Sequence, residues 1–110
     1  MRPLFHPSIE DVQPGAILHA LADPERLAIF GQIAGAGCVN TCSAAASAGD
    51  RVIPKSSLSN HIRVLREAGL IRSERQGAEM RNFSRCTEID GRFPGLLSAI
   101  LDAYRRANGE

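Results

Sequence analysis

The fold of this chain is decided by the stretch Ile53–Ile71, which reads IPKSSLSNHIRVLREAGLI. Leu58, Ile62 and Leu65 recur at three- and four-residue intervals, so they form one apolar face of a helix. A proline near the start of the stretch suits the beginning of that helix, and Gly69 suits its left-handed end. We therefore expect an amphipathic helix here, with its apolar face turned into a core.

The other face of this helix is polar, but it lacks the Glu and Lys pairs that support an ordinary solvent-exposed helix. Short hydrogen-bonding side chains on a protruding helix are suited to reading base edges and binding phosphates. The candidates for entering a major groove are Ser56, Ser57, Ser59, Asn60 and Arg63. The alternative interpretation is a polar surface helix that binds nothing.

A basic hairpin is expected directly after the helix. Residues 70–75 and 80–85 have the pattern of two short strands, and Gly77 can take the positive φ that a hairpin turn needs. The hairpin carries four arginines, which are Arg72, Arg75, Arg81 and Arg85. A helix followed by such a hairpin is typical of a winged helix-turn-helix. The residues expected to contact DNA phosphates or the adjoining groove of the duplex are Lys55, His61, Arg75 and Arg81.

Two segments carry a more specific resemblance, Leu21–Ile29 (LADPERLAI) and Ser57–Ile71 (SLSNHIRVLREAGLI). In this order and at this separation they resemble the ArsR/SmtB family of bacterial transcriptional repressors, and the similarity extends through the expected wing to Phe93–Leu97. The resemblance implies a dimeric winged helix-turn-helix protein, mainly α with a small β-hairpin wing, that dimerises through its terminal helices and binds operator DNA. It also implies release of the operator when a metal ion, a thiol oxidant or a small molecule binds.

Length and composition are those of one small globular domain. The chain has 110 residues, of which 44% are hydrophobic, and no apolar run is long enough to cross a membrane. Its three cysteines are an odd number, which argues against a disulfide framework. The N-terminus lacks the apolar segment of a signal peptide. We therefore expect a cytoplasmic protein.

The net charge of +1 conceals an uneven distribution. Residues 51–85 hold eight Lys and Arg against three acidic side chains, whereas residues 1–50 hold two against five. Residues 86–110 hold three against four. The positive charge is thus concentrated in the third of the chain that contains the expected helix and hairpin, as in a nucleic-acid binder.

Helices are expected before this basic third. Apolar residues over about residues 9–21 predict a first helix, which Pro14 interrupts. Asp23 is a good N-cap, and Pro24 fits the first position of a second helix that runs to about Ala34.

Residues 38–49 are almost all small and are the hardest to interpret. The resemblance implies a positioning helix there, from Asn40 or Thr41 to Ala48. After the wing, Asp90–Arg92 is expected to break the chain before the last helix. The expected parts of the single domain 1–110 are then a loose arm over about 1–10, a recognition helix over about 54–69, a wing over about 70–86 and a C-terminal helix over about 93–107.

The last helix has an apolar stripe at three- and four-residue steps, which something must cover. Its members are Leu96, Leu97, Ile100, Leu101 and Tyr104. The resemblance implies that a second subunit covers the stripe, making it a dimer interface. The alternative is a helix folded back onto its own domain.

Cys38 and Cys42 are candidates for a sensor, because paired thiolates suit thiophilic metal ions and react with oxidants. The compact cysteine pair that arsenic-responsive family members carry on the positioning helix is not reproduced here. The aspartate-and-histidine set of zinc-responsive members is also missing from the last helix. The alternative is that both cysteines are small buried residues without chemistry. We predict no metal site and no cofactor, and a thiophilic ion or a thiol oxidant stays open as the signal.

Three other classes of protein compete with a DNA-binding repressor. A winged-helix protein-interaction module would not need the excess charge of residues 51–85. A thiol-redox protein would need two residues between its cysteines, whereas Cys38 and Cys42 are separated by three. Ser57 and His61 lack the nucleophile turn and the oxyanion hole of a hydrolase. We therefore predict a homodimeric repressor without enzymatic activity, released from an inverted-repeat operator by an unidentified inducer.

Overall fold

The computed structural model describes residues 4–35, 40–41 and 53–109. Cys38, Cys42 and residues 43–48 of the expected positioning helix lie outside these ranges. The elements in chain order are a 3-10 turn η1 (Ile9–Asp11), α1 (Pro14–Leu21), α2 (Pro24–Gly35), β1 (Asn40–Thr41), α4 (Lys55–Glu67), β2 (Ile71–Gln76), β3 (Glu79–Ser84), α5 (Cys86–Arg92) and α6 (Leu96–Ala107).

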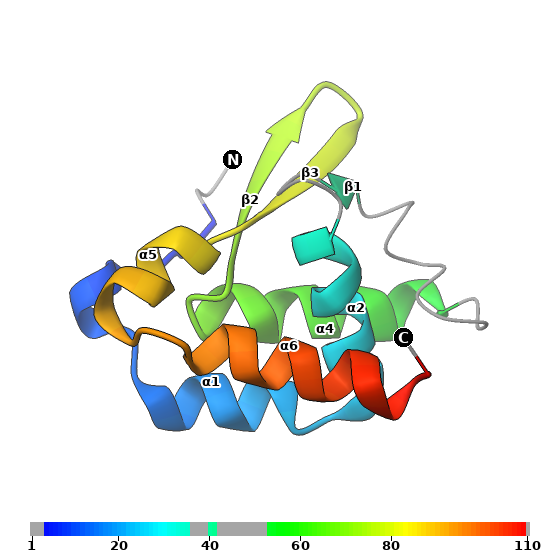
Figure 1. Ribbon diagram of the computed structural model, residues 1–110. Helices are drawn as coiled ribbons and strands as arrows, with labels where there is room; N and C mark the ends of the chain where they lie inside the picture. Colours follow the sequence, from blue (N-terminus) through cyan, green and yellow to red (C-terminus); the bar gives the residue numbers. More distant parts are fainter. Residues whose placement is uncertain (1–3, 36–39, 42–52, 110) are drawn as a thin grey trace.

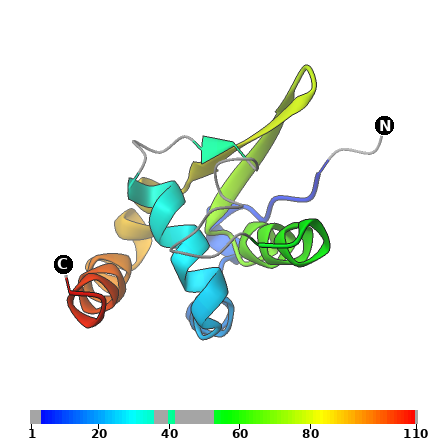
Figure 2. The same cartoon turned by 90° about the vertical axis from the view of Figure 1, so that its right-hand side faces the viewer.

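A helical body carries one projecting hairpin (Figure 1). Helices α4 and α6 lie on opposite sides of the body, with α1 and α2 between them, and β2 and β3 rise above it (Figure 2). The strand order in the sheet is β1-β3-β2, with both pairs antiparallel. In the part of the chain that the structure describes, one edge of β2 is therefore not covered by another strand. This arrangement confirms the mainly α fold with a β-hairpin wing.

The amphipathic helix is confirmed as α4. Leu58, Ile62 and Leu65 are buried in the core, as their spacing predicted. At its C-terminal end Gly69 has φ +89°, and Leu70 N–H donates to the Leu65 carbonyl at 3.0 Å. A second bond, from Gly69 N–H to the carbonyl three residues earlier, completes a Schellman cap. The cap ends the helix and turns the chain directly into β2.

The hairpin also has the expected turn. Gln76 pairs with Glu79, which leaves two residues in the turn, and Gly77 has φ +64°. At the base of the hairpin, Ser73 Oγ donates to Asn82 Oδ1 at 2.8 Å, and both residues are buried. This hydrogen bond satisfies polar groups that the core encloses.

Two expectations about secondary structure are wrong. Asn40 and Thr41 do not begin a helix, because they form β1 and pair with β3. Asp90–Arg92 does not break the chain, because it completes the short helix α5. Helix α5 has one fully buried side chain, Ile89, and the Asp90 carboxylate accepts the Gly95 backbone N–H at 3.1 Å. A single buried anchor gives too weak a periodic signal to reveal such a helix.

Helix α6 packs in part on its own domain. Leu97 and Leu101 are 5% and 7% exposed and belong to the single core. Leu96, Ile100 and Tyr104 are only partly buried. The stripe therefore divides into a covered half and a half that is still accessible.

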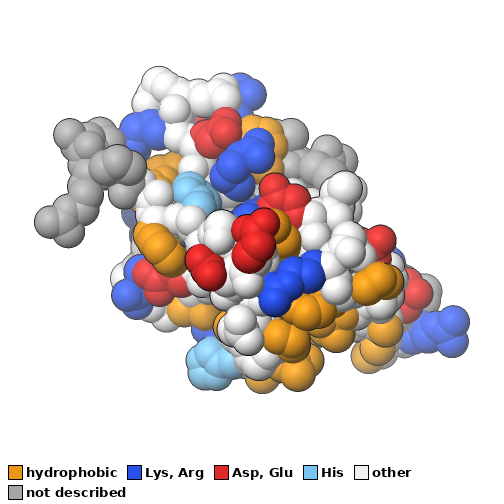
Figure 3. Space-filling view, turned by 90° about the vertical axis from the view of Figure 1, so that its left-hand side faces the viewer, with side chains coloured by type: hydrophobic (Ala, Val, Ile, Leu, Met, Phe, Trp, Pro, Cys, Tyr) orange, Lys and Arg blue, Asp and Glu red, His pale blue; other side chains and the backbone are white. Residues whose placement is uncertain are grey.

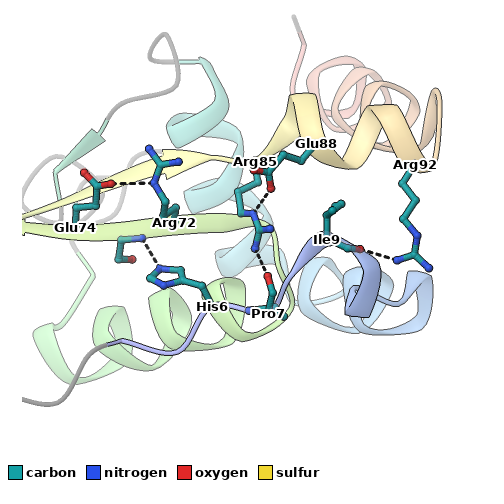
Figure 4. A network of polar contacts seen from close by, with 9 residues as sticks. His6, Pro7, Ile9, Arg72, Glu74, Arg85, Glu88 and Arg92 are labelled. Atoms are coloured by element: carbon teal, nitrogen blue, oxygen red, sulfur yellow. Dashed lines mark hydrogen bonds and ion pairs between the residues drawn. The ribbon is translucent and has the colours of Figure 1, made fainter.

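The N-terminal arm is not loose from residue 6 onward. His6 Nε2 accepts the Ser73 backbone N–H at 3.0 Å, and the Pro7 carbonyl accepts from Arg85 at 2.8 Å. Arg92 donates to the Ile9 carbonyl at 2.7 Å. Figure 4 shows these contacts joining the arm to β2, α5 and the residue between β3 and α5. Arginine side chains far along the chain thus satisfy carbonyls of a segment without regular structure.

Asp23 should stabilise the start of α2. Its carboxylate accepts the Arg26 backbone N–H at 3.0 Å, and this bond is the main reason that the pKa of Asp23 lies below its usual value. We expect Asp23→Ala to lower the free energy of unfolding by about 1 kcal/mol in urea titrations at neutral pH. Because the folded pKa is depressed, the difference from the wild type should shrink as the pH falls below about 4.

The control is Asp102→Ala, which removes an exposed carboxylate from α6 and should change stability little. Equal losses in the two variants would show that Asp23 is not a cap.

Candidate nucleic-acid interface

Helix α4 presents a continuous polar face to solvent. Ser56, Ser59, Asn60 and Arg63 are exposed, and Ser57 is partly buried at the margin of the same face. Arg63 donates to the Asn60 side-chain oxygen at 2.6 Å. The amide and the guanidinium, the two groups most often used for bidentate contacts with adenine and guanine, are thus held together on one turn.

The start of α4 adds a positive charge to this face. Lys55 is exposed at the first helical position, and Pro54 precedes it as the N-cap. Among the described residues, neither Lys55 nor Arg63 pairs with an acidic side chain. Both charges are therefore available to an anionic partner.

His61 does not belong to this face. It is 8% exposed, and its Nε2 lies 2.8 Å from Glu25 Oε1. Its Nδ1 lies 3.5 Å from an Arg26 guanidinium nitrogen. The imidazole is enclosed between α2 and α4. The expected phosphate contact of His61 is therefore wrong. The ring instead links the two helices.

Arg26 is the centre of the polar cluster around His61. It is 9% exposed, and its Nε donates to the Ala20 carbonyl at 2.6 Å. A second guanidinium nitrogen reaches the His19 carbonyl at 3.3 Å. These carbonyls lie near the C-terminal end of α1, where a cation is favourable. Arg26 therefore ties the end of α1 to α2, and through His61 to α4.

The neutral form of His61 fits both of its neighbours. With the proton on Nε2, the ring donates to the Glu25 carboxylate and leaves Nδ1 free to accept from Arg26. A second proton on Nδ1 would face the Arg26 guanidinium. The geometry therefore assigns this tautomer.

The two wing arginines expected to act together lie on opposite faces of the hairpin. Arg75 pairs across the strands with Met80, whereas Arg81 pairs with Glu74. Cross-strand partners share a face and successive residues alternate, so Arg75 and Arg81 point in opposite directions. Arg75 is exposed, and Arg81 lies 3.7 Å from Glu79.

Part of the positive charge of the hairpin is offset by acids. Arg72 lies 3.0 Å from Glu74 and is stacked over the Phe83 ring, with 4.8 Å to the ring centroid. Arg85 is almost buried and bonds Glu88 at 2.6 Å. Arg72 and Arg85 therefore serve the structure of the wing and its base. Of the four hairpin arginines, Arg75 stands without an acidic partner among the described residues.

The described residues contain no group of three or more His, Cys, Asp or Glu side chains that could hold a metal ion. Cys86 begins α5 and packs against the core. Within the same ranges no helix is long and apolar enough to span a membrane.

Comparison with known proteins agrees with the geometry. The helix-turn-helix domain family matches residues 21–74, which include α2, α4 and most of β2. The chain is a winged helix-turn-helix protein. No curated protein matches its sequence.

Two solved structures share the complete winged helix-turn-helix fold. One is an ArsR family transcriptional regulator, with a TM-score of 0.61, 24% identity, and coverage of 96% of this chain and 99% of that one. The other is reduced HlyU from Vibrio cholerae, with a TM-score of 0.62, 18% identity, and coverage of 87% and 88%. The likeness shows a shared fold, so this chain has the winged helix-turn-helix architecture of both proteins.

The inward position of His61 had a signal in the sequence. His61 follows Leu58 by three residues and precedes Leu65 by four, so it lies on the same helical face as these core residues. Its partners Glu25 and Arg26 are 36 and 35 residues away, and nothing local connects them to it.

Replacing His61 should destabilise the winged helix-turn-helix protein. His61→Ala leaves the Arg26 guanidinium and the Glu25 carboxylate without the ring between them and opens a cavity. We expect the free energy of unfolding to fall by about 2–4 kcal/mol. The matched control is Asn60→Ala, the exposed neighbour, which should lose less than about 0.5 kcal/mol. Similar small losses in both variants, measured by urea titration, would contradict the linking role.

Proposed function

We propose that this protein is a homodimeric repressor that binds an inverted-repeat DNA operator and leaves it when an inducer binds. The observation that carries the proposal is the exposed face of α4, on which Asn60 and Arg63 are held together at 2.6 Å. Such a face has no role in the core of the domain. It supplies the donors and acceptors that distinguish base pairs in a major groove.

Within this proposal the polar residues have distinct tasks. Ser56, Ser57, Ser59, Asn60 and Arg63 contact base edges. Lys55 and Arg75 contact phosphates, because each is exposed and has no acidic partner among the described residues. Arg81 can contribute after exchanging Glu79 for a phosphate. His61 has no direct contact and instead orients α4.

The dimer is proposed to form on the surface shared by α1 and α6. Leu18 on α1 is 53% exposed, and Ile100 and Tyr104 on α6 are partly exposed. Figure 3 shows hydrophobic side chains gathered along the lower edge of the molecule, where α1 and α6 lie in Figure 1. Two-fold symmetry of the protein would then require two-fold symmetry of the operator.

We include release by an inducer in the proposal, but we assign no binding site to the inducer. Cys38 and Cys42, the sequence-based candidates, lie outside the described residues. A ligand must favour the state that does not bind DNA by about 1.4 kcal/mol for each tenfold loss of affinity. A thiolate–metal link or a disulfide can supply such a difference.

DNA binding is tested by titrating duplexes at several salt concentrations. We expect the logarithm of the affinity to fall with the logarithm of the salt concentration, by about 0.9 per phosphate neutralised. Arg63→Ala should cost about 1–3 kcal/mol on a duplex selected from a random pool, and little on an unselected one.

The control is Arg105→Ala on α6, an exposed arginine on the side of the body opposite α4 (Figure 2). It should bind like the wild type. A wild type that binds no duplex would leave the winged fold as an interaction module and end the proposal.

Dimerisation is tested at Leu18, because Leu97 and Leu101 are core residues whose replacement would unfold the domain. Leu18→Glu should give a folded monomer with weaker DNA binding, since the second half-site is lost. The control is Ala16→Glu, on the same helix about 200° away. Sedimentation of the wild type as a monomer at micromolar concentration would refute the dimer.

A further inference from the structure

The N-terminal arm, Leu4–Ser8, carries two adjacent apolar side chains that the fold does not bury. Leu4 is 36% exposed and Phe5 is 63% exposed. Among the described residues, Leu18 is the one other large hydrophobic with comparable exposure, and it lies on α1. An arm that served only to cover the body would turn its largest side chains inward. The pair is therefore suited to contact with something outside the chain.

The position of the arm indicates what that partner is. The arm leaves the body between β2 and α4, on the side that α4 and the hairpin occupy and away from α6 (Figure 2). This is the side proposed above to face DNA. An arm in that gap would meet the same duplex between the contacts of the wing and those of α4.

One side chain fixes the arm in this gap. His6 Nε2 accepts the Ser73 backbone N–H at 3.0 Å, on the edge of β2 that no other strand of the described residues covers (Figure 4). The next residue, Pro7, is held through its carbonyl by Arg85 at 2.8 Å. Together these bonds stop the arm from swinging away from β2.

The bond to Ser73 requires a neutral imidazole. Nε2 can accept a hydrogen bond only while its lone pair is free, and protonation converts it to a donor. The charged groups that face His6 are Arg66 from α4, Arg72 from β2 and Arg85 after β3. Arg72 and Arg85 are paired with Glu74 and Glu88, respectively.

The surroundings oppose protonation of His6. Burial lowers the pKa of His6 from its usual value, and the Arg66 guanidinium lowers it further. A backbone hydrogen bond with Leu4 acts in the opposite direction. The contribution of the bond to Ser73 is thus present above the ordinary histidine pKa of about 6.5 and is lost as the pH falls through the lower folded value.

We propose that His6 is a positioning residue, which holds the arm between the wing and α4 while its imidazole is neutral, so that Leu4 and Phe5 form a third DNA-contacting element. The proposal rests on the DNA-binding function above. DNA sugars and thymine methyl groups are the apolar surfaces that such side chains can meet.

The first experiment examines the arm without DNA. The amide proton shift of Ser73 is followed by NMR from pH 8 to pH 5 in the wild type, His6→Ala and His6→Gln. Gln places an amide oxygen near the position of Nε2 and does not titrate. We expect a pH-dependent shift in the wild type, a pH-independent bonded shift in His6→Gln, and loss of the bond at every pH in His6→Ala. The same Ser73 shift in all three would overturn the positioning role.

The second experiment measures affinity for a selected duplex. At pH 7.5, Phe5→Ala and His6→Ala should each bind about fivefold more weakly, the size of one partly buried aromatic contact. Phe5→Ala should keep the Ser73 amide bond. On acidification the wild type should lose affinity relative to His6→Gln, and this comparison isolates His6 because the two proteins differ only at that residue. His19→Gln, at an exposed position on α1, is the matched control.

The outcomes separate the two proposals. Wild-type affinity in Phe5→Ala and His6→Ala, with strong DNA binding by the wild type, would refute the arm contact and leave the regulator intact. A wild type without DNA binding would refute the arm contact together with the proposed function. The Ser73 shifts would still decide whether His6 positions the arm.

Discussion

The close contact between Gly69 and Val12 is the constraint on which the rest of the interface depends. A Cβ at Gly69 would lie 2.4 Å from Val12 Cγ2, and the residue has φ +89°. Both facts exclude other side chains at this position. Because Gly69 joins α4 to β2 through a two-bond cap, it fixes the direction in which the hairpin leaves the helix. The relative position of the α4 face and the wing therefore follows from one turn.

Burial of the other side of α4 fixes its rotation about its own axis. Leu58, Ile62 and Leu65 lie in the core, so Asn60 and Arg63 must face outward. His61 adds directional bonds to this apolar packing, because its ring meets Glu25 on one side and Arg26 on the other. Apolar contacts alone tolerate small rotations, whereas hydrogen bonds of fixed geometry do not. A helix that reads bases benefits from that restriction.

Many of the arginines of this protein have structural tasks. Arg26 donates to a backbone carbonyl of the preceding helix, and Arg85 and Arg92 donate to backbone carbonyls of the distant N-terminal segment. Counting basic residues along the sequence therefore overstates the charge that is available for DNA. The available positive charge is carried by exposed residues such as Lys55, Arg63 and Arg75, which have no acidic partner among the described residues. An interface of this kind depends on few contacts, each at a defined position.

The sequence by itself determined α4, its glycine stop and the hairpin turn, because helical spacing, a left-handed glycine and a two-residue turn are local effects. Only the tertiary structure decided that His61 faces Glu25, that Arg75 and Arg81 point apart, and that His6 bonds the edge of β2. It also decided the formation of α5, whose one buried side chain is Ile89 and which lies against η1 near the start of the chain. These outcomes depend on which segments meet, and contacts between residues 35 to 67 positions apart leave no periodic trace in the sequence.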